Sequence, residues 1–248
     1  MIDTHAHLDA CADAPEDLVR RARDAGVGRI LTVATTVDGA RDALALADRF
    51  EGVAAILGVH PHEAGGDDGG RLDELRELLA HPKAVAVGET GLDFYRDYAP
   101  HDRQLDLFER ELALADDVGK PVVVHTRAAD AETLAVLASF EGEVVLHCFS
   151  SPRLLEPALD RGYYVSFAGN VTYRNAADLR VAAAQVPAER ILAETDCPYL
   201  APVPRRGRPN EPANVVHTVA VLAEARGEEV DALEAQIDAN AARVFGPA

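Results

Sequence analysis

Histidines and carboxylates recur directly after short apolar runs along the chain. In Val122-Val123-Val124-His125 and Val144-Val145-Leu146-His147, three apolar residues precede a histidine. A polar side chain at the tip of an apolar strand is costly unless it binds something. The polar residues in such positions are His5, His7, His60, Glu89, His125, His147 and Asp196. Neutral imidazoles and carboxylates together suit Zn²⁺, Mn²⁺ or another divalent ion.

The segment His5-Ala6-His7 adds a local geometric argument. Side chains two residues apart on a strand point the same way, so both histidines can hold one ion, although such pairs also occur by chance on surfaces. Six candidate ligands, His5, His7, Glu89, His125, His147 and Asp196, exceed what one tetrahedral ion needs. We therefore predict two divalent ions (Mg²⁺, Mn²⁺ or Zn²⁺), with Asp196 as both ligand and proton acceptor. Glu194 is interpreted as a supporting carboxylate on the same strand face.

The elements that position these residues are short β-branched runs with helical patterns between them. The strand-like runs lie at about 1–7, 29–35, 54–60, 84–89, 121–126, 143–149, 163–168 and 191–196. Helical spacing of apolar residues follows at about 15–25, 72–79, 102–118, 130–139, 153–161, 213–225 and 228–245. Alternating strands and helices without a linker predict one domain over 1–248 with the (β/α)8 TIM-barrel fold. In such a barrel the carboxyl ends of the strands share one reactive face.

Composition limits the possible partners. The chain has 248 residues, of which 48% are hydrophobic, so it can bury a large core. Its formal net charge of -18 argues against broad, non-specific binding to duplex nucleic acid. Of the 24 basic residues only Lys83 and Lys120 are lysines, a bias that fits either a GC-rich genome or a high-salt cytoplasm.

One basic cluster stands out against that acidity. Arg205, Arg206 and Arg208 follow the eighth strand and are predicted to bind a phosphate backbone, with an ordinary solvated loop as the alternative. His62 follows the third strand, and we assign it to a phosphate oxygen or leaving group, with an exposed loop histidine as the equal alternative.

The cysteines and the first residues bear on location. Cys11, Cys148 and Cys197 are odd in number and form no CxxC pair, so neither a disulfide framework nor a thiolate zinc site is indicated. Cys148 and Cys197 are interpreted as small packed apolar groups. The first residues show no signal-peptide pattern, and no run is long enough to cross a bilayer. We expect a cytoplasmic protein with no membrane partner and no obligate protein partner.

Long ordered motifs resemble the TatD family of metal-dependent hydrolases over nearly the whole chain. The matching stretches are Asp3-Thr4-His5-Ala6-His7, Gly58-Val59-His60-Pro61-His62, Gly88-Glu89-Thr90-Gly91-Leu92-Asp93-Phe94-Tyr95, Pro121-Val122-Val123-Val124-His125, His147-Cys148-Phe149-Ser150, Glu194-Thr195-Asp196-Cys197-Pro198-Tyr199-Leu200 and Arg208-Pro209-Asn210-Glu211-Pro212. The resemblance implies that His5 and His7 hold one ion with Asp196. It further implies that His125 and His147 hold the second ion and that Glu89 bridges both.

The resemblance also implies an activity. Relatives are deoxyribonucleases that trim single-stranded nucleic acid from the 3′ end, in which metal-activated water attacks phosphorus in line. Two alternatives stay open. Some relatives cleave esters, including D-aminoacyl-tRNA, and a pocket beside the metals large enough for an amino-acid side chain would favour that substrate. A catalytically silent metal-binding scaffold is the third possibility, against which the complete ligand set argues.

Overall fold

The computed structural model describes residues 1–247, in which parallel strands alternate with helices. The strands are β1 (Ile2–Ala6), β2 (Arg29–Val33), β3 (Val53–Leu57), β4 (Ala84–Asp93), β5 (Val122–Arg127), β6 (Val144–Leu146), β7 (Tyr164–Phe167) and β8 (Ile191–Ala193). The α-helices are α1 (Pro15–Asp24), α2 (Val37–Arg49), α3 (Leu72–Leu79), α4 (His101–Val118), α5 (Asp130–Val136), α6 (Leu155–Asp160), α7 (Ala177–Gln185), α8 (Val215–Arg226) and α9 (Val230–Phe245). Sheet order follows sequence order from β1 to β8. This topology confirms the predicted (β/α)8 TIM-barrel class.

The chain divides into two compact units. Unit 1 comprises Met1–Thr32 and Cys148–Ala248, and unit 2 comprises Val33–His147. Unit 1 contains β7, β8, β1 and most of β2, whereas unit 2 contains β3 to β6. Each unit therefore supplies half of the strands, and the single domain over 1–248 stays a prediction.

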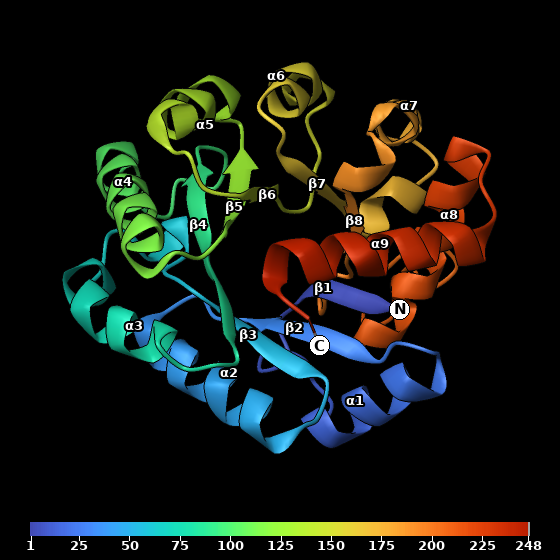
Figure 1. The fold of residues 1–248 in the computed structure, drawn as a ribbon, viewed down its shortest axis with the longest axis horizontal. Helices are drawn as coiled ribbons and strands as arrows, with labels where there is room; N and C mark the ends of the chain where they lie inside the picture. Colours follow the sequence, from blue (N-terminus) through green and yellow to red (C-terminus); the bar gives the residue numbers. More distant parts are fainter. Residues whose placement is uncertain (248) are drawn as a thin grey trace. The chain divides into compact units, whose positions relative to one another are not determined.

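In unit 1, β1 is hydrogen-bonded to the segment that follows β8. The His7 amide donates to the Cys197 carbonyl at 2.8 Å, and the Asp196 amide donates to the His5 carbonyl at 2.9 Å. On its other side β1 pairs with β2, with Ile2 opposite Arg29. Figure 1 shows α9 running past the start of β1, where the N-terminal ammonium lies 3.1 Å from the Glu234 carboxylate. These contacts fix the backbone on both sides of the histidine pair.

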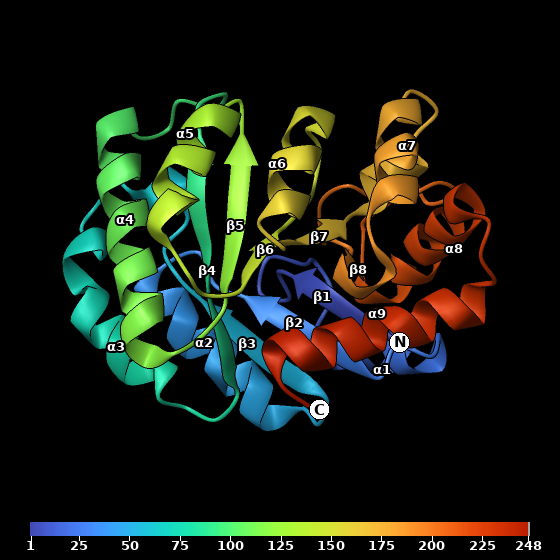
Figure 2. The ribbon, with the colours of Figure 1, turned by 45° about the horizontal axis from the view of Figure 1, so that its top comes forward.

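In unit 2, β4 is the long central strand. It pairs with β3 and β5, and β5 pairs with β6. Figure 2 shows α4 running alongside β4 and β5, with α5 beside it. Helix α4 ends at Gly119, whose φ of 64° is the left-handed conformation that glycine adopts without steric cost. The helix that the apolar spacing predicted over 102–118 is confirmed.

Two helices, α2 and α7, were not expected from the sequence. Helix α2 begins after Thr36, whose side-chain oxygen accepts a hydrogen bond from the Gly39 amide at 3.0 Å. Helix α7 buries Ala182 and Ala183, and alanine gives little hydrophobic periodicity, so its local signal is weak. Helix α2 instead buries Val37, Ala40, Leu44 and Ala47 at helical spacing, so its pattern could have predicted the helix.

Candidate metal centre

Unit 2 gathers three imidazoles around one carboxylate. The Glu89 Oε1 atom, on β4, lies 2.9 Å from His125 Nδ1, 3.2 Å from His147 Nε2 and 3.3 Å from His60 Nε2. All but His125 are nearly inaccessible to solvent. One ligand atom from each of His60, Glu89 and His125 falls within 4.8 Å of the others, so these residues are spaced to share an ion.

A second carboxylate, Asp93, holds the outer side of this group. Its Oδ2 atom lies 2.9 Å from His62 Nε2 and 3.2 Å from His125 Nε2. The Tyr95 and Arg96 amides both donate to its Oδ1 atom at 2.9 Å. His125 is therefore held between two carboxylates, which is the arrangement that orients metal-ligating imidazoles in proteins.

The charges in this group perturb one another strongly. Burial alone would raise the pKa of Glu89, but His147, His60 and His125 hold it well below its usual range. Burial lowers the pKa of His60 to about 4. Burial also opposes the charge on His125, yet its bonds to Asp93 and Glu89 raise the pKa of that imidazole. Unit 2 therefore keeps anionic oxygens next to nitrogen donors, as a divalent cation requires.

Glycine allows the strands to approach one another next to Glu89. A Cβ on Gly58 would lie 2.5 Å from the Gly88 carbonyl carbon, and a Cβ on Gly88 would lie 2.6 Å from the Val123 oxygen. Gly88 also has a φ of 149°, which side chains rarely permit. Glu89 thus follows a backbone position that only glycine fits.

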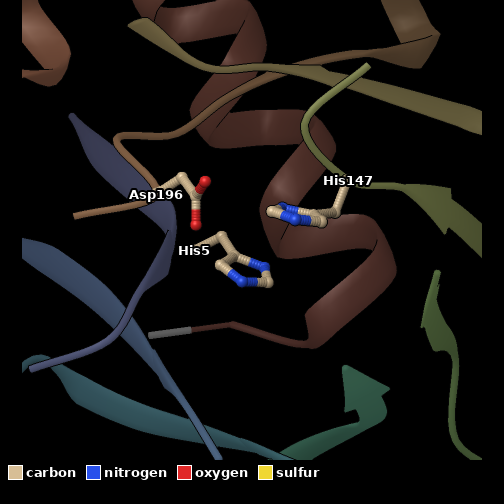
Figure 3. Close-up of side chains that lie close together, drawn as sticks. All are labelled: His5, His147 and Asp196. Atoms are coloured by element: carbon tan, nitrogen blue, oxygen red, sulfur yellow. The ribbon is translucent and has the colours of Figure 1, made fainter. Parts of the chain in front are cut away.

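Unit 1 brings together a smaller group. His5 Nε2 lies 3.3 Å from His7 Nε2, and His7 Nε2 lies 3.5 Å from Asp196 Oδ1. Figure 3 shows the His5 ring projecting from β1 and the Asp196 carboxylate projecting from the segment after β8. All three residues are buried, so two imidazoles and a carboxylate face one another in a protected site.

Buried polar groups fix the backbone beneath the unit 1 ligands. The Asp3 carboxylate accepts hydrogen bonds from the Thr195 amide at 2.8 Å and from the Thr195 hydroxyl at 2.6 Å. Burial raises the pKa of Asp3 to about 8. The Glu194 carboxylate accepts from the Ser166 hydroxyl at 2.5 Å and from the Cys148 amide at 2.7 Å.

Several strand boundaries differ from the expected ones. Strands β3, β6 and β8 end before His60, His147 and Asp196, so these three residues lie in the segments that follow the strands. Asp196 has a φ of 54°, and strand alternation does not extend to it. The expectation that Glu194 and Asp196 share a strand face was therefore wrong.

Two functional candidates were missing from the predicted ligand set. Asp93 lies four residues after Glu89 on β4, and period-two alternation could have placed it on the same face. His60 follows an apolar run, and the structure places its Nε2 atom 3.3 Å from Glu89 Oε1. Among the predicted ligands, unit 2 brings together Glu89, His125 and His147, whereas unit 1 brings together His5, His7 and Asp196.

The predicted basic cluster lies in an exposed loop of unit 1. Arg206 stacks over the Tyr173 ring at 4.0 Å. Arg205 and Arg208 line a cavity of about 280 Å³ together with Arg21. Arg21 is ion-paired with Glu211 and Asp13, whereas within residues 1–247 neither Arg205 nor Arg208 has a carboxylate at ion-pair distance.

Unit 2 has a similar arginine and tyrosine arrangement after β4 and β5. The Arg127 guanidinium lies 4.1 Å from the centre of the Tyr95 ring, which is 64% exposed. His62 is half-buried, and its ring packs edge-on against the exposed Tyr98 at 4.7 Å. Exposed aromatic rings beside positively charged side chains are typical of surfaces that bind single-stranded nucleic acid.

Comparison with known proteins identifies the family to which this chain is similar. The family model described as TatD related DNase matches residues 2–246. A Mycobacterium tuberculosis protein named uncharacterized metal-dependent hydrolase TatD is 40% identical, and the alignment covers 99% of this chain and 98% of that protein. A Klebsiella pneumoniae protein named 3'-5' ssDNA/RNA exonuclease TatD is 38% identical, covering 93% of this chain and 91% of that protein.

Solved structures agree with this match. The Escherichia coli TatD homologue YjjV superposes with a TM-score of 0.94 at 32% identity, covering 100% of this chain and 98% of that one. A TatD family hydrolase from Entamoeba histolytica, at 20% identity and a TM-score of 0.90, supports the fold. None of the helices within residues 1–247 is long and apolar enough to cross a membrane.

Proposed function

The chain belongs to the TatD-related DNase family of metal-dependent hydrolases, and from this premise we propose that it is a two-metal phosphodiesterase acting on single-stranded nucleic acid from the 3′ end. The observation that carries the proposal is the Glu89 carboxylate within 3.3 Å of three imidazoles. Imidazole nitrogens gathered around a buried carboxylate are the donors of a catalytic metal centre.

The donor chemistry fits divalent cations. Both groups consist of imidazole nitrogens and carboxylate oxygens, which suit Zn²⁺ or Mn²⁺ and, with more oxygen ligands, Mg²⁺. His5, His7 and Asp196 would hold one ion and His125 and His147 would hold a second, and Glu89 would serve as a ligand in this centre. Family membership supports this assignment, as does the (β/α)8 class, in which strand carboxyl ends form one reactive face.

The proposed roles follow from each side chain's contacts. When bound, the metal ions lower the pKa of water and neutralise charge that develops on the phosphate. Asp196 accepts the proton of the attacking water, and its backbone is fixed by the hydrogen bond to His5. Asp93 orients His125 and also positions His62, which we assign to a phosphate oxygen or leaving group.

The two arginine and tyrosine pairs support a nucleic-acid substrate. Tyr95 with Arg127 and Tyr173 with Arg206 provide aromatic faces for bases and guanidinium groups for phosphates. Within residues 1–247, Arg127 and Arg206 have no carboxylate at ion-pair distance, so they present local positive charge to an anionic strand. The names of relatives such as the Klebsiella pneumoniae exonuclease point the same way.

The substrate assay distinguishes the proposed reaction from ester hydrolysis. Protein reconstituted with Mn²⁺, Mg²⁺ or Zn²⁺ is incubated with single-stranded DNA, duplex DNA, RNA and a D-aminoacyl-tRNA, and the product ends are identified. We expect mononucleotides released from the 3′ end of single strands. Cleavage of the aminoacyl ester alone would contradict the proposal, as would inactivity on every substrate with both metals bound.

The basic loop provides a second test. Replacing Arg205, Arg206 and Arg208 by Ala should raise KM for a single-stranded oligonucleotide and flatten its salt dependence, because phosphate contacts are sensitive to salt. Hydrolysis of a small chromogenic phosphodiester, which is too short to reach the loop, should change little. The control replaces Arg41, Arg76 and Arg110, whose partners are surface carboxylates, and removes the same charge. An equal effect of both triple variants would show that only net charge matters.

A further inference from the structure

Two cysteines far apart in sequence meet beside the unit 1 ligands. Cys11 Sγ lies 3.7 Å from Cys197 Sγ, and neither forms a disulfide. Cys11 lies in the loop between β1 and α1, while Cys197 directly follows Asp196. A disulfide needs a sulfur separation of about 2.05 Å, so a small movement of the Cys11 loop would allow the bond to form.

The two thiols differ in access to solvent. Cys197 is fully buried, whereas Cys11 is half-buried and lines the 280 Å³ cavity that also contains Arg21, Arg205 and Arg208. The contact with the Cys197 thiol lowers the pKa of Cys11. A thiol in a cavity with cationic side chains is the kind that oxidants reach, and a buried thiol beside it can resolve the product.

We propose that Cys11 and Cys197 form a peroxide-sensitive thiol pair whose disulfide weakens metal binding by His5, His7 and Asp196. The oxidant is hydrogen peroxide or an organic hydroperoxide. The effect on metal binding rests on the proposed function, whereas formation of the disulfide does not.

The chemistry has two steps. The Cys11 thiolate attacks a peroxide oxygen, the O–O bond breaks, and Cys11 becomes a sulfenic acid as hydroxide leaves. The Cys197 sulfur then attacks the Cys11 sulfur, the S–O bond breaks, and water leaves with the proton of Cys197. In total, two thiols and one hydrogen peroxide give one disulfide and two waters.

The backbone transmits this change to the metal ligands. The Cys197 carbonyl accepts the His7 amide at 2.8 Å, and the Cys197 amide donates to Thr195 Oγ1 at 3.2 Å. The preceding residue is Asp196, whose amide donates to His5. A covalent bond at Cys197 therefore acts on the segment that positions all three proposed ligands of unit 1.

The test uses the full-length protein and a matched cysteine control. Wild type, Cys11→Ser and Cys148→Ser are treated with hydrogen peroxide, and then thiols are counted, intact mass is measured and peptides are mapped. Cys148 is also half-buried, so Cys148→Ser controls for general thiol oxidation. We expect wild type and Cys148→Ser to lose two thiols and two hydrogens of mass, with a Cys11 to Cys197 crosslink that dithiothreitol reverses. Cys11→Ser should form no crosslink.

Zn²⁺ titration gives a readout that is independent of nuclease activity. In the oxidised wild type, the affinity for one of the Zn²⁺ ions should fall by roughly 10-fold or more. This is the usual cost when a metal ligand loses the contacts that orient it. Peroxide should leave Zn²⁺ affinity unchanged in Cys11→Ser. The absence of the crosslink, a crosslink to Cys148 instead, or a complete crosslink with unchanged Zn²⁺ affinity would each overturn the inference. Failure to cleave nucleic acid would contradict only the proposed function.

Discussion

The two units hold their imidazoles by different means. In unit 2, two carboxylates contact four imidazoles directly, with Glu89 against His60, His125 and His147 and Asp93 against His62 and His125. In unit 1, the Asp196 carboxylate lies 3.5 Å from His7 Nε2, and the Asp3 and Glu194 carboxylates accept hydrogen bonds from backbone amides and hydroxyls. Contacts between carboxylates and imidazoles are thus prominent in the unit 2 group, whereas hydrogen bonds to the backbone are prominent around the unit 1 group.

The largest effect is expected at Glu89. Glu89→Gln keeps the size of the side chain but removes the charge that three imidazoles surround, so turnover should fall by roughly 10³-fold or more, as when a member of a catalytic unit is lost. Metal analysis should find fewer than two ions per chain. Two equivalents of bound metal with near-normal turnover would disprove the assignment of Glu89 as a metal ligand.

Asp196→Asn tests unit 1 in the same way. The amide keeps a coordinating oxygen and the backbone bonds but removes the proton acceptor, so the rate should fall by about 10² or more. Metal content should fall less than in Glu89→Gln, because backbone hydrogen bonds hold His5, His7 and residue 196 in place. If rate and metal content instead decline in proportion, Asp196 is only a ligand and the contrast between the units weakens.

Asp93→Asn probes the orienting carboxylate of unit 2. Loss of its charge should reduce turnover by roughly 10–100-fold, the usual cost of losing a partner that orients a metal ligand. Because Asp93 contacts both His62 and His125, its effect should be non-additive with His62→Ala in a double-mutant cycle. Strict additivity of the two changes would show that Asp93 does not act through His62.

The smallest effect concerns stability, at the buried Glu111 of unit 2. Its carboxylate accepts hydrogen bonds from the Val59 amide and the Thr90 hydroxyl, and burial raises its pKa to about 8. The folded protein therefore keeps a proton that the unfolded chain loses above its lower, ordinary pKa. The contribution of the protonated Glu111 to the free energy of unfolding is therefore largest at acidic pH, below the ordinary glutamate pKa. It is lost as pH rises toward 8.

Glu111→Gln, which does not titrate, removes this dependence. The free energy of unfolding, measured by urea denaturation at pH 5 and pH 8, should change less with pH in the variant than in wild type. The two proteins should differ in this pH-dependent change by roughly 1–3 kcal/mol. Activity measured at pH 7 serves as the control and should be retained. Parallel pH profiles for wild type and variant would mean that Glu111 is ionised in the folded protein.

The sequence by itself determined which polar residues follow apolar strands and where the clearest helix lies. Burying the His125 imidazole at the end of the apolar run Val122-Val123-Val124 costs free energy unless it binds something. Strand alternation places His5 and His7 on one face. Both signals are local in sequence. The (β/α)8 class followed from the same alternation of strands and helices.

Only the tertiary structure showed that Asp93 supports His125, that His60 meets Glu89 and that Cys11 meets Cys197. Cys11 and Cys197 are 186 positions apart, and local periodicity says nothing about such a distance. Strand pairing, register and the glycines that let β3, β4 and β5 approach one another decide which side chains meet. A residue's type and local period determine the chemistry that it offers, whereas packing between distant segments determines the partner it receives.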